Sequence, residues 1–216
     1  MKKGFTLTEL LMALTIVGVL AVLTIPVMMN NIHNRVFANQ VKNMAATIEQ
    51  LAQDELITHR TRDLSDTDFG DPEKLLSDKH FSIAKSCTSD ESLTKCWKTT
   101  ATGKEKVTYK KLNKNAISFS GVNTIILKNG VILGYKLHSP RGTSMGAFYI
   151  DVNGNDKPNI GGRDLFSFYI NSKGHIIDEN AYRNENNNLE TQYNNCKSDY
   201  WWCYGALADS GWKMDY

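Results

Sequence analysis

Glu9 is the residue whose surroundings say most about chemistry, because it is the one carboxylate in an otherwise apolar segment over residues 5–29. A carboxylate in greasy surroundings is costly unless a cation pairs with it. A cut between Gly4 and Phe5 would create such a cation, the new α-amino group of Phe5. In a bundle of staggered helices, that ammonium can pair with Glu9 of a neighbouring chain. The pair would neutralise both charges and set the axial register of the bundle.

A second candidate for chemistry is the segment over residues 151–164, which gathers oxygen-bearing side chains in a turn-rich stretch. Carboxylate and amide oxygens are the ligands that Ca²⁺ prefers. The candidate calcium ligands are Asp151, Asn153, Asn155 and Asp164. The spacing is not that of an EF-hand, because the twelfth position is Gly162 rather than glutamate. The same residue types are ordinary in wide loops, so the sequence favours a loop without a cofactor, and a calcium site is the alternative.

Four cysteines fall into two close pairs, Cys87 with Cys96 and Cys196 with Cys203. Neither a Cys-x-x-Cys nor a His-x-His pattern accompanies them, which argues against a zinc site. Behind a membrane-targeting segment, paired cysteines indicate two disulfides in an oxidising compartment. Four cysteines allow three connectivities, and the two local pairs are favoured because each pair lies within one loop-like segment. Free buried thiols are the alternative.

The rest of the chain offers no catalytic arrangement. The five histidines are scattered, without an H-E-x-x-H pattern. Ser144 lies in a G-x-S-x-G match, but a nucleophile elbow needs a strand before it and a helix after it, and here Pro140 precedes the match. A net charge of +2 is too small to indicate nucleic acid as a partner. The sequence therefore predicts neither an enzyme nor a specific nucleic-acid binder.

The apolar segment 5–29 has 25 residues, enough to cross a hydrocarbon core of about 30 Å as a helix. Lys2 and Lys3 precede it, which predicts a cytoplasmic start. A secretory signal peptide has a shorter apolar region and a small-residue cleavage site. No good A-x-A pattern occurs between Ala21 and Asn34, so the segment is predicted to stay in the membrane.

The stretch from Lys3 to Glu9, followed by this apolar helix, resembles the class III signal of type IV pilins and type II secretion pseudopilins. In that family a prepilin peptidase cuts after the glycine and methylates the new N-terminal phenylalanine. The resemblance therefore implies cleavage after Gly4, N-methylation of Phe5 and an assembly role for Glu9. It covers about the first thirty residues, and its parts must coincide, which makes it specific.

The resemblance implies a 1–4 leader peptide and a single-pass protein of the inner (cytoplasmic) membrane, with its globular domain outside the cytoplasm. After assembly the chain would be part of a pilus or pseudopilus. The implied partners are like subunits in a filament, the prepilin peptidase, an inner-membrane assembly platform and the membrane itself. The alternative is a membrane-tethered extracytoplasmic binding module that does not polymerise. The sequence does not separate pilus, secretion pseudopilus and DNA-uptake machine, or major and minor subunit.

One helix is predicted from about residue 5 to residue 58, with a membrane or filament-core half over 5–29 and an amphipathic half over 30–58. Apolar residues recur in the second half at steps of three and four. They are Phe37, Val41, Met44, Ile48 and Leu51. Pro26 predicts a bend or local melting between residues 26 and 34.

The globular domain is predicted to span residues 59–216, with a short helix over 72–76. The predicted strands are 116–120, 124–127, 131–137, 147–152, 165–170 and 175–177. Asn129-Gly130 indicates a type I′ hairpin, and 171–174 another tight turn. Short connections favour an antiparallel meander packed on the amphipathic half-helix. The expected fold class is therefore α+β, with a C-terminal tail from Tyr182 looped by a disulfide.

Overall fold

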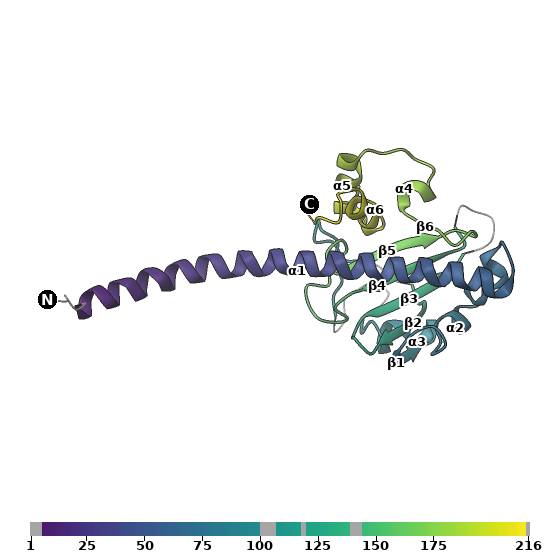
Figure 1. Ribbon diagram of the computed structural model, residues 1–216, viewed down its shortest axis with the longest axis horizontal. Coiled ribbons are helices and arrows are strands. Elements are labelled where there is room, and N and C mark those ends of the chain that lie inside the picture. Colours follow the sequence, from purple (N-terminus) through teal and green to yellow (C-terminus); the bar gives the residue numbers. More distant parts are fainter. Residues whose placement is uncertain (1–5, 100–106, 118–119, 139–143, 215–216) are drawn as a thin grey trace.

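The computed structural model describes residues 6–99, 107–117, 120–138 and 144–214. A single 53-residue helix, α1 (Leu7–His59), projects from the globular domain at its N-terminal end and packs on the domain with its second half (Figure 1). At about 1.5 Å per residue, the helix is about 80 Å long. The predicted α+β fold, with an N-terminal apolar helix and an antiparallel sheet, is confirmed.

Local signals set both ends of α1. Thr6 is its N-cap, and Arg60 ends it in the left-handed conformation, with φ of 54°. The Arg60 N–H donates to the carbonyl of Ile57 at 3.1 Å, so one of the last carbonyls is satisfied. The helix continues through Pro26, and the predicted local melting over 26–34 is wrong. One proline removes one backbone donor, and the long helix curves gently instead (Figure 1).

The second half of α1 packs through small side chains. Three alanines spaced by seven residues, Ala38, Ala45 and Ala52, are fully or almost fully buried, together with Val41 and Ile48. The buried face of the helix is therefore rotated relative to the predicted one. Phe37, Met44 and Leu51 are only partly buried and pack at the border of the core. Alanine lets the helix backbone approach the domain closely, while the larger side chains fill the space at either side.

The sheet is a six-stranded antiparallel meander in the order β1-β2-β3-β4-β5-β6. Its strands are β1 (Ile83–Cys87), β2 (Asn123–Leu127), β3 (Ile132–Leu137), β4 (Gly146–Asp151), β5 (Leu165–Ile170) and β6 (Ile176–Ile177). The neighbouring strands β4 and β5 are buried along their whole length. Apart from Asp151 and Ser167 they are made of apolar residues, tyrosines and one glycine, because both faces of the sheet are covered at this point.

The β2–β3 hairpin confirms the predicted turn position but not its type. Leu127 and Val131 pair across a three-residue loop, with the Leu127 N–H 2.9 Å from the Val131 carbonyl. Gly130 has φ of +91°, whereas Asn129 is not among the residues with positive φ. A type I′ turn needs positive φ at both central residues. The loop is instead a turn followed by a left-handed glycine, and Gly174 (φ +79°) has the same place in the β5–β6 turn.

Two strand assignments from the sequence were wrong. β1 was missed because its sequence, Ile-Ala-Lys-Ser-Cys, mixes small, polar and apolar residues, and three of its five residues are exposed at the sheet edge. The expected strand at 116–120 is reduced to one bridge, between Lys110 and Ala116, and residues 118–119 lie outside the described part. The connection between α1 and β1 holds short helices: η1 (Leu64–Asp66), η2 (Asp68–Gly70) and α2 (Pro72–Leu75), the last as predicted. α3 (Ser89–Lys95) follows β1.

The C-terminal tail is helical rather than irregular. It contains α4 (Glu179–Tyr182), α5 (Leu189–Ser198), η3 (Tyr200–Trp202) and α6 (Cys203–Asp209). Trp201 stacks on Tyr169 of β5 at 5.0 Å between ring centroids, and Tyr204 lies 4.7 Å from Phe168. Consecutive strand residues face opposite sides of a sheet, so the tail wraps around the β5 side of the sheet and covers both faces.

Candidate functional site

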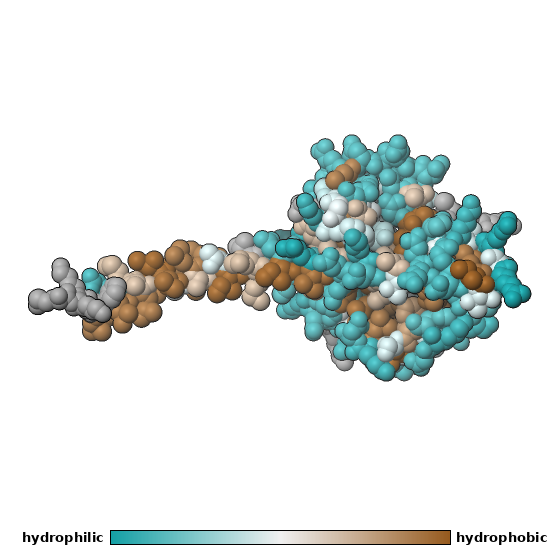
Figure 2. All heavy atoms as spheres, in the orientation of Figure 1, coloured by the Kyte–Doolittle hydropathy of each residue, from teal (hydrophilic) through white to brown (hydrophobic). Residues whose placement is uncertain are grey.

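The first half of α1 is an apolar helix on which no other described part of the chain packs. The stretch Leu7–Ile25 is long and apolar enough to cross a membrane, and none of it is buried. Figure 2 shows this stretch as a nearly continuous apolar surface, in contrast to the largely hydrophilic domain. Its exposed large side chains include Leu11, Val17, Val22 and Leu23. Such a surface is stable only in lipid or against other apolar helices.

At the tip of this helix, Glu9 is held by Thr6. The Thr6 N–H and hydroxyl both donate to Glu9 Oε2 at 2.8 Å, and the Glu9 N–H donates to the Thr6 hydroxyl at 3.2 Å. This is a reciprocal capping box. The sequence analysis missed Thr6, although its spacing from Glu9 is the signature of that motif. Gly4 and Phe5, the predicted cleavage and methylation residues, lie outside the described residues.

The cysteines pair locally, Cys87 with Cys96 and Cys196 with Cys203. The first disulfide ties the end of edge strand β1 to the residue after α3. The second joins α5 to α6 and lies against Gly162, where an added Cβ would come within 3.1 Å of both sulfurs. Each disulfide therefore closes a short loop at the margin of the sheet.

The segment 151–164 bulges out between β4 and β5. Asp151 pairs with Leu165 across the two strands, so the ends of the loop, Asp151 and Asp164, lie together and are both fully buried. The Tyr109 hydroxyl donates to Asp151 Oδ2 at 2.7 Å. The N–H groups of Asn159 and Ile160 each donate to Asp164 at 2.6 Å.

Burial dominates the electrostatics of this pair of carboxyl groups. It raises the pKa of Asp151 well above the usual range, and the neighbouring Asp164 raises it further. Burial also raises the pKa of Asp164 to about 6, although backbone N–H groups lower it. A divalent cation would favour the charged form of both groups.

The asparagines of the loop leave acceptor oxygens without partners. The Asn153 side-chain amide donates to the carbonyls of Asp156 and Lys157, and that of Asn155 donates to the carbonyl of Cys96 at 3.0 Å. The Oδ1 atoms of Asn153, Asn155 and Asn159 are buried and have no hydrogen-bond partner among the described residues. Buried acceptors are normally satisfied. The donor chemistry therefore fits a hard cation, and Asn159 is a member that the sequence analysis missed.

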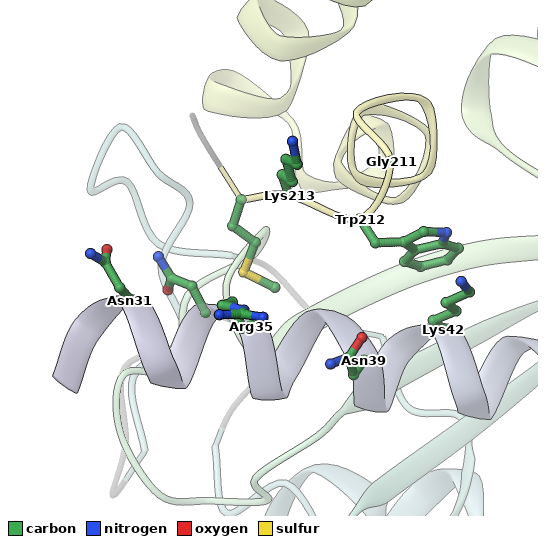
Figure 3. Close-up of a pocket in the computed structure, with 9 residues that line it drawn as sticks. Asn31, Arg35, Asn39, Lys42, Gly211, Trp212 and Lys213 are labelled. Carbon is green, nitrogen blue, oxygen red and sulfur yellow. The ribbon is translucent and has the colours of Figure 1, made fainter. Parts of the chain in front are cut away.

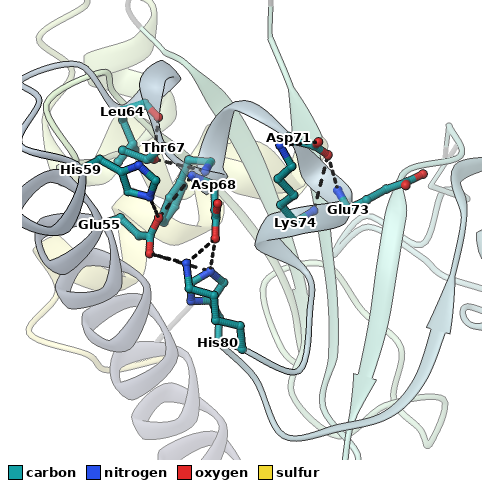
Figure 4. A network of polar contacts seen from close by, with 11 residues as sticks. Glu55, His59, Leu64, Thr67, Asp68, Asp71, Glu73, Lys74 and His80 are labelled. Carbon is teal, nitrogen blue, oxygen red and sulfur yellow. Dashed lines mark hydrogen bonds and ion pairs between the residues drawn. The ribbon is translucent and has the colours of Figure 1, made fainter.

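A third cluster, which the sequence did not indicate, ties the C-terminal end of α1 to the following turns (Figure 4). Lys79 Nζ lies 2.6 Å from Asp68 and 3.2 Å from Glu55, and His80 lies 2.9 Å from Asp68. His59 pairs with Glu55 one turn along the helix. The hydrogen bond from Lys79 lowers the pKa of Asp68 more than burial raises it.

Glu55, Asp68 and His80 bring ligand atoms within 4.8 Å of one another, a spacing that a metal ion could use. The Lys79 ammonium already contacts both carboxylates, which makes the cluster an ion-pair network. Its members come from three elements separated in sequence, so no local motif announced it. We assign it to holding α1 on the domain.

Comparison with known proteins bears on the first of these sites. Residues 1–25 match the family described as the prokaryotic N-terminal methylation motif. No curated protein and no solved structure matches the chain. The matched residues include Gly4, Phe5 and Glu9, and the match ends at Ile25, the last residue of the membrane-length stretch. The chain therefore carries the prepilin-type class III signal of the type IV pilin and pseudopilin family.

Proposed function

We propose that the chain is a structural subunit of a type IV pilus or of a type II secretion-like pseudopilus. It is cleaved after Gly4, N-methylated at Phe5 and assembled through α1. The observation that carries the proposal is the bare apolar stretch Leu7–Ile25 directly behind a methylation motif. The apolar surface fits lipid before assembly and fits the same helix of neighbouring subunits afterwards, so one element serves both stages.

Glu9 supplies the register of the assembly. Thr6 occupies Glu9 Oε2, whereas Oε1 accepts no hydrogen bond among the described residues. That oxygen is available to the Phe5 ammonium of a neighbouring subunit. Thr6 fixes the carboxylate at the first turn of the helix, so the acceptor is oriented before the partner arrives. A fixed acceptor loses less side-chain entropy on pairing than a mobile one.

The N-terminal residue of the mature protein tests the proposal. Mass spectrometry of the full chain, extracted from membranes that contain a prepilin peptidase, is expected to give a protein that begins at Phe5 and carries one added methyl group. The same chain made without the peptidase is the control and should retain Met1 or its processed form. A chain that begins elsewhere in both preparations would refute the proposal. A correctly cut chain that never enters filaments would favour the tethered binding module.

The segment 151–164 supports a second part of the proposal, a calcium ion in the globular domain. Asp151, Asp164 and the amide oxygens of Asn153 and Asn155 would hold it, with Asn159 in addition. The ion would neutralise two buried carboxylates and satisfy amide oxygens that otherwise lack partners. The ion would stabilise the connection between β4 and β5 and would have no catalytic role.

The two disulfides support an extracytoplasmic domain. Disulfides persist in oxidising compartments and are rare in the cytosol. With Lys2 and Lys3 before the span and the cysteines behind it, the proposed topology is a single pass through the inner membrane with the domain outside. The positive charges before the span agree with that direction.

A further inference from the structure

A groove lies where the bare half of α1 meets the domain. Its volume is about 680 Å³. One wall is the helix over residues 31–42, and the other is the C-terminal segment Gly211–Met214 (Figure 3). The tail was brought here by the wrapping of α5 and α6 around the sheet, so the groove joins two parts of the chain that are far apart in sequence.

The described walls of the groove are cationic. Arg35 and Lys42 reach into it from α1, and Lys213 lies on the opposite wall (Figure 3). Three asparagines make up the rest of the helical wall, and none of the described lining residues carries a carboxylate. Arg35, Lys42 and Lys213 form no ion pair among the described residues. Lys42 Nζ instead lies 5.6 Å from the ring centroid of Trp212, in a cation–π contact.

The position of the groove along α1 sets its depth relative to a membrane. The membrane-spanning stretch ends at Ile25, and exposed apolar side chains continue to Ile32. Arg35 follows Ile25, the last residue of that stretch, by ten residues, about 15 Å along the axis. The headgroup region beside a hydrocarbon core is about 5–7 Å deep. The Arg35 backbone therefore lies just beyond the headgroup region when Leu7–Ile25 is inserted. Its long side chain, which a helix tilts toward its N-terminus, extends back toward the lipid phosphates.

The second wall carries the features of a membrane interface. Lys213 has a long stem that lets an ammonium reach phosphates, and Trp212 is an aromatic residue of the kind enriched at headgroup level. Lys42 lies two turns farther from the membrane than Arg35, where it holds the indole of Trp212. Lys42 is engaged by Trp212, so Arg35 and Lys213 are the two lining cations left for a phosphate.

We propose that the groove binds the phosphate of an anionic phospholipid in the outer leaflet before the subunit is assembled. This inference rests on the membrane-inserted stage of the proposed function. Bound lipid would hold the domain against the membrane surface through two cations. Departure of the subunit into a filament would then require those contacts to be released.

The test uses the full chain in nanodiscs of phosphatidylcholine and phosphatidylglycerol in a 3:1 ratio. After extraction into mild detergent, the retained lipids are counted by native mass spectrometry. The wild type is expected to retain phosphatidylglycerol in excess of its share. Arg35→Gln with Lys213→Gln should lower that preference roughly five-fold for each cation removed. Each basic residue near an anionic membrane surface contributes about 1 kcal/mol, which corresponds to that factor in affinity.

The matched control also removes one arginine and one lysine charge, but near the opposite end of α1. Arg62 and Lys173 line a shallower pocket near the end of α1, far from the membrane side. Arg62→Gln with Lys173→Gln should leave the lipid preference at the wild-type value. Equal retention of the two lipids by the wild type, or an equal loss in both double variants, would overturn the proposal.

Two further arms separate this inference from its alternatives. Excess inorganic phosphate should leave the retained phosphatidylglycerol unchanged, and its release by phosphate would overturn the lipid assignment in favour of a soluble anion. Incorporation into pure phosphatidylcholine nanodiscs tests the inserted stage itself. A chain that fails to insert there contradicts the proposed function. A chain that inserts there, but shows no preference for phosphatidylglycerol in the mixed nanodiscs, contradicts only the lipid site in the groove.

Discussion

The two halves of α1 share one backbone geometry but differ in what covers them. In the first half, Leu7–Ile25, large apolar side chains point in all directions and none is buried. In the second half, a narrow stripe of alanines with Val41 and Ile48 is buried, and polar side chains cover the remainder. A helix that is apolar all round needs lipid or other helices, whereas a one-sided helix needs a single partner surface. The domain supplies that surface to one half only.

The two halves also differ in how charge is handled. Near the domain, Glu55 is buried and has cations within reach on the same chain, among them Lys79 at 3.2 Å. Near the tip, Glu9 is exposed and has only Thr6 as a partner among the described residues. The first carboxylate is satisfied within the subunit, and the second is left for another subunit. This difference separates a folding contact from an assembly contact.

The largest expected effect is the loss of assembly on replacing the tip carboxylate. Glu9→Gln should be cleaved normally but should enter filaments at least about a hundred-fold less, because the Phe5 ammonium would then lack a charged partner in low-dielectric surroundings. The measurement is the ratio of sheared filament protein to membrane-bound protein on immunoblots. Glu49→Gln, which changes a half-exposed carboxylate on the same helix that pairs with His175, is the matched control. Equal incorporation of both variants would remove the basis for a special role of Glu9.

The contrast in packing is sharpened by the same substitution in both halves. Ile48→Ala, in the buried stripe, should destabilise the domain by about 2–5 kcal/mol, because it leaves a cavity between α1 and the sheet. Ile16→Ala, at a position 55% exposed, should leave the free energy of domain unfolding unchanged. Urea unfolding of each full chain in detergent micelles measures both. If Ile16→Ala destabilised the domain as much as Ile48→Ala, the two halves would have to unfold as one unit.

Much of this arrangement was predictable because local patterns announce it. Glycine at position 130 and at position 174 marked both hairpin turns, and predominantly apolar runs marked β4 and β5. The exposed edge strand β1 was missed because its Lys and Ser side chains face solvent, where strand composition is not enforced by packing. The tail was misjudged for a related reason. Its asparagines read as loop, whereas Asn188 is the N-cap of α5.

The candidate sites divide in the same way. Phe5 and Glu9 belong to a short linear motif, and the sequence alone pointed to them. Tyr109 and Asn159 reach the buried pair of carboxyl groups only because the fold brings separate segments together. The cluster around Glu55 and the groove around Arg35 likewise join residues that are far apart in sequence. Such sites have no local sequence motif, because they are defined by proximity in the folded chain rather than by spacing along the sequence.

A smaller effect is expected from the buried loop of the domain, where stability depends on pH. The pKa of Asp164 rises from 3.8 to about 6 on folding, so the folded chain keeps a proton that the unfolded chain has released. This stabilisation is complete below pH 4 and is lost as the pH rises to about 6. At about 1.4 kcal/mol per unit of pKa, the loss is about 3 kcal/mol. Asp151 is shifted in the same direction.

Thermal unfolding of the full chain in detergent, followed from pH 4 to pH 7 with a chelator and then with millimolar Ca²⁺, measures this loss. Calcium binds the charged carboxylates, so it should restore the stability near pH 7. The dependence of the unfolding temperature on pH should therefore become weaker. Asp164→Asn should remove the part of the pH dependence of stability that comes from Asp164, and it should also remove the stabilisation by calcium. A wild-type chain whose stability is the same with chelator and with calcium at pH 7 would contradict the calcium proposal.

The smallest expected effect returns to the tip of α1. Thr6→Ala removes the N-cap and the hydroxyl that holds Glu9, and loss of an N-cap typically costs about 1 kcal/mol. Amide exchange of the first turn, in micelles, should therefore be about five-fold faster, while the second half of α1 exchanges as before. Thr6→Ser keeps the hydroxyl and should behave as the wild type.

Incorporation into filaments decides what the cap contributes to assembly. The Thr6→Ala variant keeps the Glu9 charge, so it should still assemble, but several-fold less well, because the carboxylate is no longer fixed before pairing. Thr6→Ala must therefore lie between the wild type and Glu9→Gln. If it assembled as poorly as Glu9→Gln, Thr6 itself would make the intersubunit contact. If it assembled as well as the wild type despite a frayed first turn, charge alone would set the register and orientation of Glu9 would be irrelevant.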